Sequence, residues 1–263
     1  DAVDAFPVQS GNFVFFCRRN AGFTTVHQMQ PGILSETPVS YQVSSQLDSY
    51  IRGNPVEMVA FTSPNILFVR TDADPYTLYV FSYLDSAGAN ERVFDSWSKW
   101  TWHPDLGALT GIAADDGELL VHLVRKHNNT LYNACERFSL ATEFNGVPHL
   151  DSMRKQSTWV AGTLLDGVDN EGAAFAFGPS RAVRLVGVPG DRLSDLDDFP
   201  APDRAELLAG YMFPSYVTPT NPFPKDNKDN AIVHCRMTLG RVDVPLANSG
   251  GMKLSITTTS GTK

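Results

Sequence analysis

Carboxylates gathered at short intervals are the residues of this sequence best suited to chemistry. Asp72 and Asp74 lie in TDADP, and Asp115 and Asp116 lie in ADDGE. A glycoside hydrolase needs two carboxyl groups that face each other across one cleft. Each of these pairs instead lies in a segment rich in turn-forming residues, where Asp hydrogen-bonds to its own backbone. We therefore expect these carboxylates to shape turns and not to form a catalytic pair.

A third acidic cluster lies in SDLDDFP, at Asp195, Asp197 and Asp198. Carboxylate oxygens suit Ca²⁺, but an EF-hand loop requires regular ligand spacing and a central Gly. This segment has neither, so the sequence assigns no metal site here.

Histidines and cysteines offer no better constellation. His122 and His127 are five residues apart on an expected hairpin, and an odd separation in a strand places side chains on opposite faces. Cys17, Cys135 and Cys235 are widely spaced and lack a CxxC pair, so we expect buried or free thiols, as suits a protein folded in a reducing cytoplasm. Neither GxSxG nor a glycine-rich phosphate loop is present. We assign no catalytic, cofactor-binding or metal-binding residue and expect no cofactor.

Tryptophans cluster in SWSKWTW at residues 96–102. Trp100 and Trp102 share one face of an extended strand, and Trp97 lies on the other. Such rings can form a stacking platform for sugars or bases. The interpretation that we favour is a strand whose large rings fill the space between neighbouring sheets.

Short strands that recur along the first half of the chain must position all of these groups. TLY occurs at residues 77–79 and 130–132, 53 positions apart. The same step aligns residues 12–17 (NFVFFC), 65–70 (NILFVR) and 118–123 (ELLVHL) without a gap. Each copy contains turn residues, a short apolar run, a polar hairpin and a second apolar run that opens with Thr. Runs this short, rich in Phe, Val, Tyr and Thr, predict strands.

The second run of the middle copy indicates how the strands are covered. Leu78 and Val80 lie on one face and Tyr79 and Phe81 on the other, so both faces need an apolar partner. With further strand-like stretches at 56–61 and 109–114, each unit holds three or four strands. Stacked propeller blades bury both faces, and known blades repeat about every 40 to 50 residues. We predict an all-β fold with β-propeller-like repeats over residues 1–144, with Tyr79 and its equivalent Tyr132 packed between blades.

Residues 145–263 break this register and are predicted to form a β-rich accessory or platform domain, or an insertion. They are rich in Gly, Asp and Pro, and strand candidates lie at 158–164, 182–188, 231–244 and 252–257, with an exposed loop at 221–230. Three blades do not close a propeller. We therefore expect this chain to be a fragment of a longer polypeptide, with the missing blades outside it or within the divergent half.

Charge and hydropathy exclude two classes of function. The net charge of −8 argues against a nucleic-acid binder, and the basic stretches at 17–20 (CRRN) and 124–126 (VRK) are expected to be solvated hairpin tips. Since no apolar stretch approaches the length of about 18 residues that a spanning helix needs, we expect neither a membrane span nor a signal peptide.

Three motifs in order resemble the tail tubular protein B, or nozzle, family of short-tailed bacteriophages. They are DSYIRGNPVEMVAFTSPNILFV at 48–69, TLYVFSYL at 77–84 and DSWSKWTW at 95–102. A later stretch at 209–256 is similar to a segment of that family in which an aromatic motif precedes a β-hairpin. Each motif is degenerate, so the resemblance rests on their order and on the agreement with the repeat.

The resemblance implies a structural protein of the virion. Members of that family form a ring, a hexamer, below the upper tail adaptor ring, and their propeller domains surround the channel through which double-stranded DNA leaves. It implies contacts with further copies of the chain, the adaptor ring and tail fibres, and transient contact with DNA. The sequence lacks a family-like start and finish, so part of the propeller and the tip of the nozzle are expected to be absent.

Two other functions stay open at this point. One is a carbohydrate-binding or host-recognition propeller that uses the Trp-rich strand. The other is a cell-envelope glycoside hydrolase that uses the Asp-rich turns. A pair of carboxylates converging in one pocket would favour the enzyme.

Overall fold

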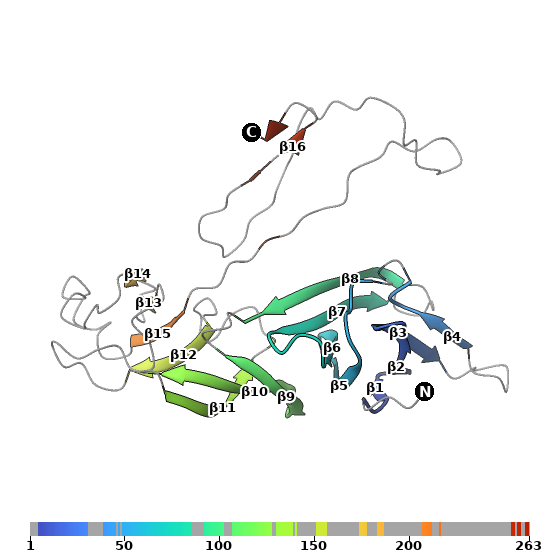
Figure 1. Ribbon diagram of the computed structural model, residues 1–263, viewed down its shortest axis with the longest axis horizontal. Coiled ribbons are helices and arrows are strands. Elements are labelled where there is room, and N and C mark those ends of the chain that lie inside the picture. The colour runs from blue at the N-terminus through green and yellow to red at the C-terminus, as the bar shows by residue number, and fades with distance from the viewer. Residues whose placement is uncertain are drawn as a thin grey trace. The chain divides into compact units, whose positions relative to one another are not determined.

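The computed structural model describes residues 5–30, 39–45, 47, 49–85, 92–102, 107–127, 130–138, 140, 151–156, 174–177, 183–186, 207–211, 216, 254–255, 257–258 and 261–262. The chain forms two compact units, Asp1–Phe213 and Pro214–Lys263. Every regular element among the described residues is a β-strand, and the strands form antiparallel sheets (Figure 1). The predicted all-β fold is confirmed, whereas the predicted domain boundary near residue 144 stays a prediction.

The first sheet, sheet A, contains four strands in chain order: β1 (Val8–Ser10), β2 (Phe13–Asn20), β3 (Phe23–Gln30) and β4 (Val39–Gln42). Ala21 and Gly22 join β2 to β3 with positive φ angles of 48° and 86°. Two successive residues with positive φ make a type I′ turn, whose twist matches that of the strands it connects. This turn fixes the register in which Asn20 pairs with Phe23.

The second sheet, sheet B, has the same order: β5 (Pro55–Thr62), β6 (Asn65–Thr71), β7 (Thr77–Asp85) and β8 (Arg92–Thr101). The third, sheet C, consists of three described strands: β9 (Ala108–Asp115), β10 (Glu118–His127) and β11 (Thr130–Phe138). Asp116 and Gly117 form the positive-φ turn between β9 and β10.

The three aligned segments occupy the same position in their sheets. Residues 13–17, 65–70 and 118–123 fall in β2, β6 and β10, each the second strand of its sheet in chain order, and Asn12 lies in the turn before β2. The strands that open near Thr24, Thr77 and Thr130 are each the third. The strands expected at 56–61 and 109–114 are β5 and β9. The repeat of period 53 is therefore confirmed at the level of strands, whereas closure into a propeller stays a prediction.

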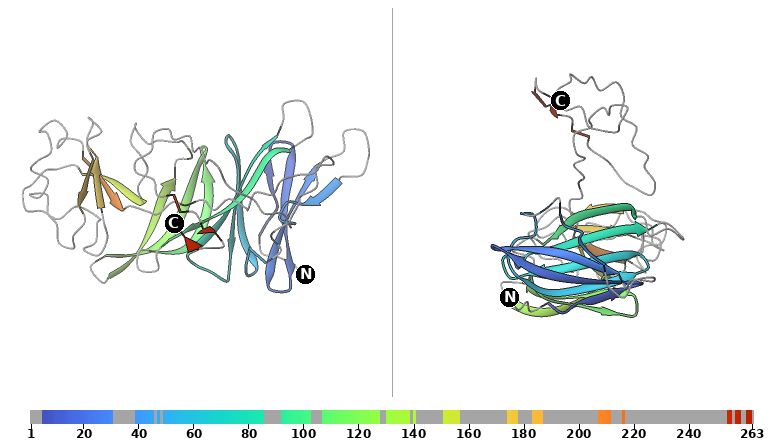
Figure 2. Two further views of the ribbon diagram at one scale, coloured as in Figure 1. Left: turned by 90° about the horizontal axis from the view of Figure 1, so that it is seen from above. Right: turned by 90° about the vertical axis from the view of Figure 1, so that its right-hand side faces the viewer.

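Sheet B is covered on both faces, as its sequence requires. On one face Leu67, Val69, Tyr79 and Phe81 form a core with residues of sheet A. The other face forms a second core with sheet C, which includes from sheet B the residues Val59, Phe61, Phe68, Leu78 and Val80. Figure 2 shows the three sheets standing one behind another, sheet A in blue, sheet B in cyan and sheet C in green. The alternation of β7 thus reflects two cores, one on each side of the same strand.

The rest of unit 1 contains sheet D, whose strands are ordered β12–β15–β13–β14. Its strands are β12 (Asp151–Gln156), β13 (Ala174–Phe177), β14 (Val183–Val186) and β15 (Leu207–Tyr211). The second unit contains the hairpin of β16 (Thr257–Thr258) and β17 (Gly261–Thr262).

The strand candidates of the second half have mixed outcomes. The strand predicted at 182–188 is confirmed as β14. The strand predicted at 252–257 is wrong for Leu254 and Ser255, which lie outside any strand, and β16 begins only at Thr257. The strands predicted at 158–164 and 231–244, and the loop at 221–230, lie outside the described residues.

Candidate functional site: the joints between the sheets

Polar groups join sheet A to sheet B around their shared apolar core. Ser10 in β1 donates its hydroxyl to the carbonyl of Phe61 at 2.9 Å and lies 2.7 Å from the Tyr83 hydroxyl. Burial raises the pKa of Tyr83, so this phenol stays protonated and available for hydrogen bonding. At the far edge the indole Nε1 of Trp97 donates to the Val43 carbonyl at 3.2 Å. The two sheets are therefore fixed at both edges as well as through their core.

Arg92 forms a second polar link across the same joint. Its Nε donates to Asp85 Oδ1 at 2.8 Å, and its Nη2 donates to Gln28 Oε1 in sheet A at 2.6 Å. The guanidinium carbon lies 4.5 Å from the ring centroid of Tyr83. Two nitrogens of this guanidinium are thus hydrogen-bonded and its plane lies near an aromatic ring, whereas the buried Nη1 has no hydrogen-bond partner among the described residues.

A pair of sulfur atoms lies in the centre of this joint. The Cys17 thiol donates to the Met58 thioether at 3.0 Å. Burial raises the pKa of Cys17 to about 12, so this thiol is neutral at physiological pH. Since the thiolate is the reactive form, Cys17 is a packing residue. The expectation of a buried or free thiol is confirmed for Cys17, which is buried, and for Cys135, which is exposed.

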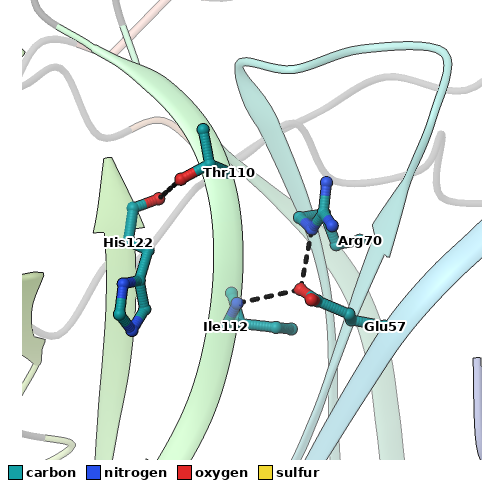
Figure 3. Close-up of polar contacts among 5 residues, drawn as sticks. All are labelled: Glu57, Arg70, Thr110, Ile112 and His122. Atoms are coloured by element: carbon teal, nitrogen blue, oxygen red, sulfur yellow. Dashed lines mark hydrogen bonds and ion pairs between the residues drawn. The ribbon is translucent and has the colours of Figure 1, made fainter. Parts of the chain in front are cut away.

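Glu57 joins sheet B to sheet C (Figure 3). Its Oε2 accepts a hydrogen bond from Arg70 Nε at 2.8 Å within sheet B and another from the backbone N–H of Ile112 in β9 at 2.9 Å. The pairing of β9 with β10 shifts register beside Thr110, whose hydroxyl donates to the His122 carbonyl at 3.1 Å. A bulge bends its strand and re-aims nearby groups. Here the bulge accompanies a backbone donor that points at a carboxylate of the neighbouring sheet.

Arg125 and Glu136 form a buried ion pair on the side of sheet C that faces sheet B. Arg125 Nε donates to Glu136 Oε1 at 2.8 Å and Nη2 donates to Oε2 at 2.7 Å. Arg125 is only 3% exposed. The expectation that residues 124–126 form a solvated tip is therefore wrong for Arg125, because the long β10–β11 hairpin brings Glu136 onto the same face. The two parallel hydrogen bonds offset part of the cost of burying both charges.

The Asp residues of the first half have structural partners. Asp72 accepts hydrogen bonds from the backbone and the side chain of Asn54 at 2.7 and 2.8 Å, and these bonds lower its pKa. Gly53, at a φ of 84°, allows this approach, since a Cβ there would clash with Ala73. Asp74 accepts from the Tyr76 N–H at 2.9 Å and from the Thr77 hydroxyl at 2.7 Å, which is an Asx turn.

In the second pair, only Asp115 has a side-chain partner among the described contacts. Asp115 forms an ion pair with Arg137, and Asp116 forms the turn between β9 and β10. The expectation of turn chemistry is confirmed for Asp74, whose carboxylate binds Tyr76 and Thr77 of its own turn. The carboxylates of Asp72 and Asp115 instead bind Asn54 and Arg137, which are 18 and 22 residues away in sequence. The cluster at residues 195–198 lies outside the described residues.

The Trp-rich strand β8 fills the two joints of sheet B. The Trp97 ring lies 4.9 Å from the Phe81 ring, on the side of sheet A. Trp100 lies 5.2 Å from Phe68, and Trp102 lies in the core shared with sheet C. The favoured interpretation, rings filling the space between sheets on alternate faces, is confirmed.

Within the described ranges no three His, Cys, Asp or Glu side chains come together as metal ligands would. His122 Nε2 lies 3.8 Å from the Cys135 thiol, a pair on the exposed face of sheet C. Nor does that part of the chain contain a helix long and apolar enough to cross a membrane.

Sequence reasoning missed the two charged groups of the joint between sheets B and C. Glu57 lies in an otherwise apolar strand, where one charge among VEMVAF marks a carboxylate that needs a partner. In the register of β10 and β11, Arg125 pairs with Tyr132, and Glu136 lies four residues farther along β11 on the same face. This placement depends on the length of the hairpin, which the sequence does not reveal. Only the first of these has a signal that a sequence reading could use.

Comparison with known proteins shows the family to which these stacked sheets belong. A search of curated protein sequences finds no match to this chain. The family of bacteriophage nozzle proteins matches residues 2–166, a range that includes sheets A, B and C with both joints. This is the family that the sequence motifs resemble. The chain therefore belongs to the bacteriophage nozzle protein family and is a structural component of a phage tail.

Proposed function

We propose that this chain forms part of the wall of the tail channel through which the phage genome leaves the virion. The observation that carries the proposal is the family match, which extends over all three stacked sheets. Joints that combine an apolar core with hydrogen bonds between sheets suit a wall, because a wall must keep its shape while DNA passes.

The charge of the chain supports this role. A protein that neutralises DNA phosphates with Lys and Arg binds DNA tightly. This chain carries a net charge of −8, with 21 basic and 29 acidic residues. An acidic surface repels phosphate and lets DNA slide past, so the charge suits transient contact better than binding.

We further propose the partners and location that follow from this role. Copies of the chain form a ring, a hexamer by the resemblance to the family, which contacts the upper tail adaptor ring and tail fibres. Residues 1–144 supply the wall, and residues 145–263 supply an accessory or platform part. The protein folds in the host cytoplasm, where Cys17 and Cys135 stay reduced, and resides in the tail of the virion.

The two alternative functions lack a supporting observation. Trp97, Trp100 and Trp102 pack between sheets, so they offer no stacking platform. Asp72 is hydrogen-bonded to Asn54, and Asp74 is hydrogen-bonded within its own turn. We propose that the chain has no catalytic role.

Negative-stain electron microscopy of the purified chain, alone and with the adaptor ring, tests the proposed function. We expect rings with a central hole that dock onto the adaptor. Isolated particles that never form rings in either preparation would contradict the channel wall. The absence of catalysis is tested on peptidoglycan and capsular polysaccharide, with Asp115→Asn/Asp116→Asn as control. Turnover by the wild type that the folded double variant lacks would favour a hydrolase.

A further inference from the structure

Sheet C carries a thiol and an imidazole side by side on its exposed face. His122 of β10 and Cys135 of β11 are direct cross-strand partners, so both side chains leave the sheet on the same face. Val121 and Leu123 belong to the core shared with sheet B, so His122 between them points the other way. Both His122 and Cys135 are exposed to solvent. The joints between the sheets therefore make no use of this pair.

The distance between the two side chains suits a shared cation better than a hydrogen bond. His122 Nε2 lies 3.8 Å from Cys135 Sγ. Two tetrahedral ligands of Zn²⁺, with bonds of about 2.3 Å to sulfur and about 2.0–2.1 Å to nitrogen, lie about 3.6 Å apart. A hydrogen bond between nitrogen and oxygen spans about 2.7–3.2 Å, and the larger radius of sulfur lengthens this range by only a fraction of an ångström. A small rotation of either side chain therefore gives a chelate.

The backbone around His122 is fixed by its neighbours in sheet C. β10 is the middle strand of the three described strands, and the Thr110 hydroxyl donates to the His122 carbonyl at 3.1 Å. Gly111, the partner of His122 in β9, has no side chain that could cover the imidazole. In Figure 3 the imidazole lies well apart from Glu57, which belongs to the joint with sheet B. Ligands held on paired strands lose little conformational freedom when a cation binds.

The charges near this pair permit a cation to bind. Arg137 lies two residues beyond Cys135 on the same face, but its guanidinium forms ion pairs with Asp115 and Glu118. The chain as a whole carries a net charge of −8. An acidic protein attracts cations to its surface, so the field of the chain favours a divalent ion at an exposed site.

We propose that His122 Nε2 and the thiolate of Cys135 bind a divalent cation of the zinc class. Imidazole and thiolate favour such ions, whereas Mg²⁺ and Ca²⁺ prefer oxygen ligands. On binding, the thiol proton passes to solvent and the sulfur donates an electron pair to the metal, whose oxidation state does not change. The cation links β10 to β11 across their hairpin.

The proposed site is open to solvent. No third His, Cys, Asp or Glu among the described residues completes a ligand set. Water therefore fills the other tetrahedral positions, and the cation exchanges more readily than in a structural site with four protein ligands. The site needs only the β10–β11 hairpin and is independent of the proposed channel wall.

Cobalt(II) tests the site, because a cobalt thiolate gives a near-ultraviolet charge-transfer band that carboxylate and imidazole ligands do not give. The full chain is reduced, freed of metal with a chelator and titrated with Co²⁺, and then with Zn²⁺. We expect the band to saturate at about one cation per chain and to disappear as Zn²⁺ displaces Co²⁺, since thiolate sites select Zn²⁺. Absence of the band in the wild type would overturn the proposal.

Single variants assign the ligands. Cys135→Ser should abolish the band. His122→Gln should weaken Zn²⁺ binding more than about tenfold, since loss of an outer-shell partner alone costs about 10–100-fold. Cys235→Ser and His127→Gln, the second in the same hairpin, are the matched controls and should leave both readouts unchanged. A band that persists in Cys135→Ser or disappears in Cys235→Ser would overturn the assignment.

A further variant separates a built site from surface binding by carboxylates. Cys135→His keeps two ligand atoms without sulfur, so it should retain Zn²⁺ binding within about tenfold of the wild type and give no thiolate band. Zn²⁺ should also slow the reaction of Cys135 with a maleimide in the wild type but not in His122→Gln, and a chelator should restore the rate. Equal Zn²⁺ binding by the wild type, Cys135→Ser and His122→Gln would show an adventitious ion only and overturn the proposal.

Discussion

Removing the carboxylate of Glu57 tests whether a single acceptor holds sheet C against sheet B. In Glu57→Ala two donors lose their acceptor, Arg70 Nε and the backbone N–H of Ile112. Ile112 is 8% exposed and the Arg70 side chain 14%, so water replaces the lost bonds poorly. An unsatisfied buried donor costs about 1–3 kcal/mol. We expect Glu57→Ala to lower the free energy of unfolding by about 2–4 kcal/mol.

The isosteric variant separates hydrogen bonding from charge. Glu57→Gln keeps an oxygen that can accept from Ile112 and loses only the charge opposite Arg70. Because the Glu57 side chain is 36% exposed, solvent screens that ion pair, and the cost should be about 0.5–1 kcal/mol. Glu118→Ala is the matched control, since Glu118 contacts only the exposed Arg137 at 3.3 Å and its loss should cost less than about 1 kcal/mol.

Thermal unfolding followed by tryptophan fluorescence is the assay, because Trp100 and Trp102 lie at the B–C joint and report its opening. For a unit of this size the expected shift for Glu57→Ala is about 4–16 °C in Tm. An unchanged Tm would refute the role of the carboxylate. If Glu57→Gln is as unstable as Glu57→Ala, the charge and not the bond to Ile112 holds the joint.

Three further predictions concern single residues of the sheets. Tyr79→Ala should lower the free energy of unfolding, measured by chemical denaturation, by about 3–5 kcal/mol, because Tyr79 is 2% exposed. Tyr132→Ala should lower it distinctly less, because Tyr132 is half-buried. Equal losses would contradict the difference in burial. In the native protein a thiol reagent should modify the exposed Cys135 and spare the buried Cys17, whose pKa is raised to about 12. Peptide mass spectrometry would show which thiol reacts. Rapid modification of both thiols would indicate that the A–B joint opens readily. The pKa of His27 is lowered below 6.5 in the folded state, so the unfolded chain binds a proton at His27 more readily than the folded chain does. The free energy of unfolding is therefore complete above about pH 6.5 and falls as the pH decreases through the folded-state pKa. His27→Gln should lose less Tm than the wild type between neutral and mildly acid pH, and an identical loss would exclude His27 as the source.

The strands of this fold could be predicted from the sequence, but the faces of some strands could not. A step of 53 residues aligns β2 with β6, so that Phe16 corresponds to Val69. Their cross-strand partners, His27 and Tyr79, are only 52 residues apart. The reason is loop length: Ala21 and Gly22 make a two-residue turn, whereas the equivalent hairpin of sheet B has a longer connection from Thr71 to Thr77. A one-residue slip moves every side chain of a strand to the other face.

The polar groups of the joints were harder to predict than the strands. The turn role of Asp74 is local, since its partners are two and three residues away, and a sequence reading finds it. The partner of Glu57 is a backbone N–H 55 residues later in β9, near a bulge of that strand. No residue type identifies such a donor, because every residue but proline has one.

The double covering of sheet B has a consequence for how this protein can evolve. Along β7 nearly every side chain from Thr77 to Tyr83 is buried, alternately on the side of sheet A and on the side of sheet C. New polar side chains are therefore disfavoured on both faces of this strand. Along β11 exposed positions alternate with half-buried ones, and every second residue is free to vary. Substitutions should therefore accumulate faster in β11 than in β7 when nozzle proteins of related phages diverge. A lineage that adapts to a new neighbour in the tail therefore has more mutational freedom in β11 than in β7, where each replacement must be accommodated within one of the two cores.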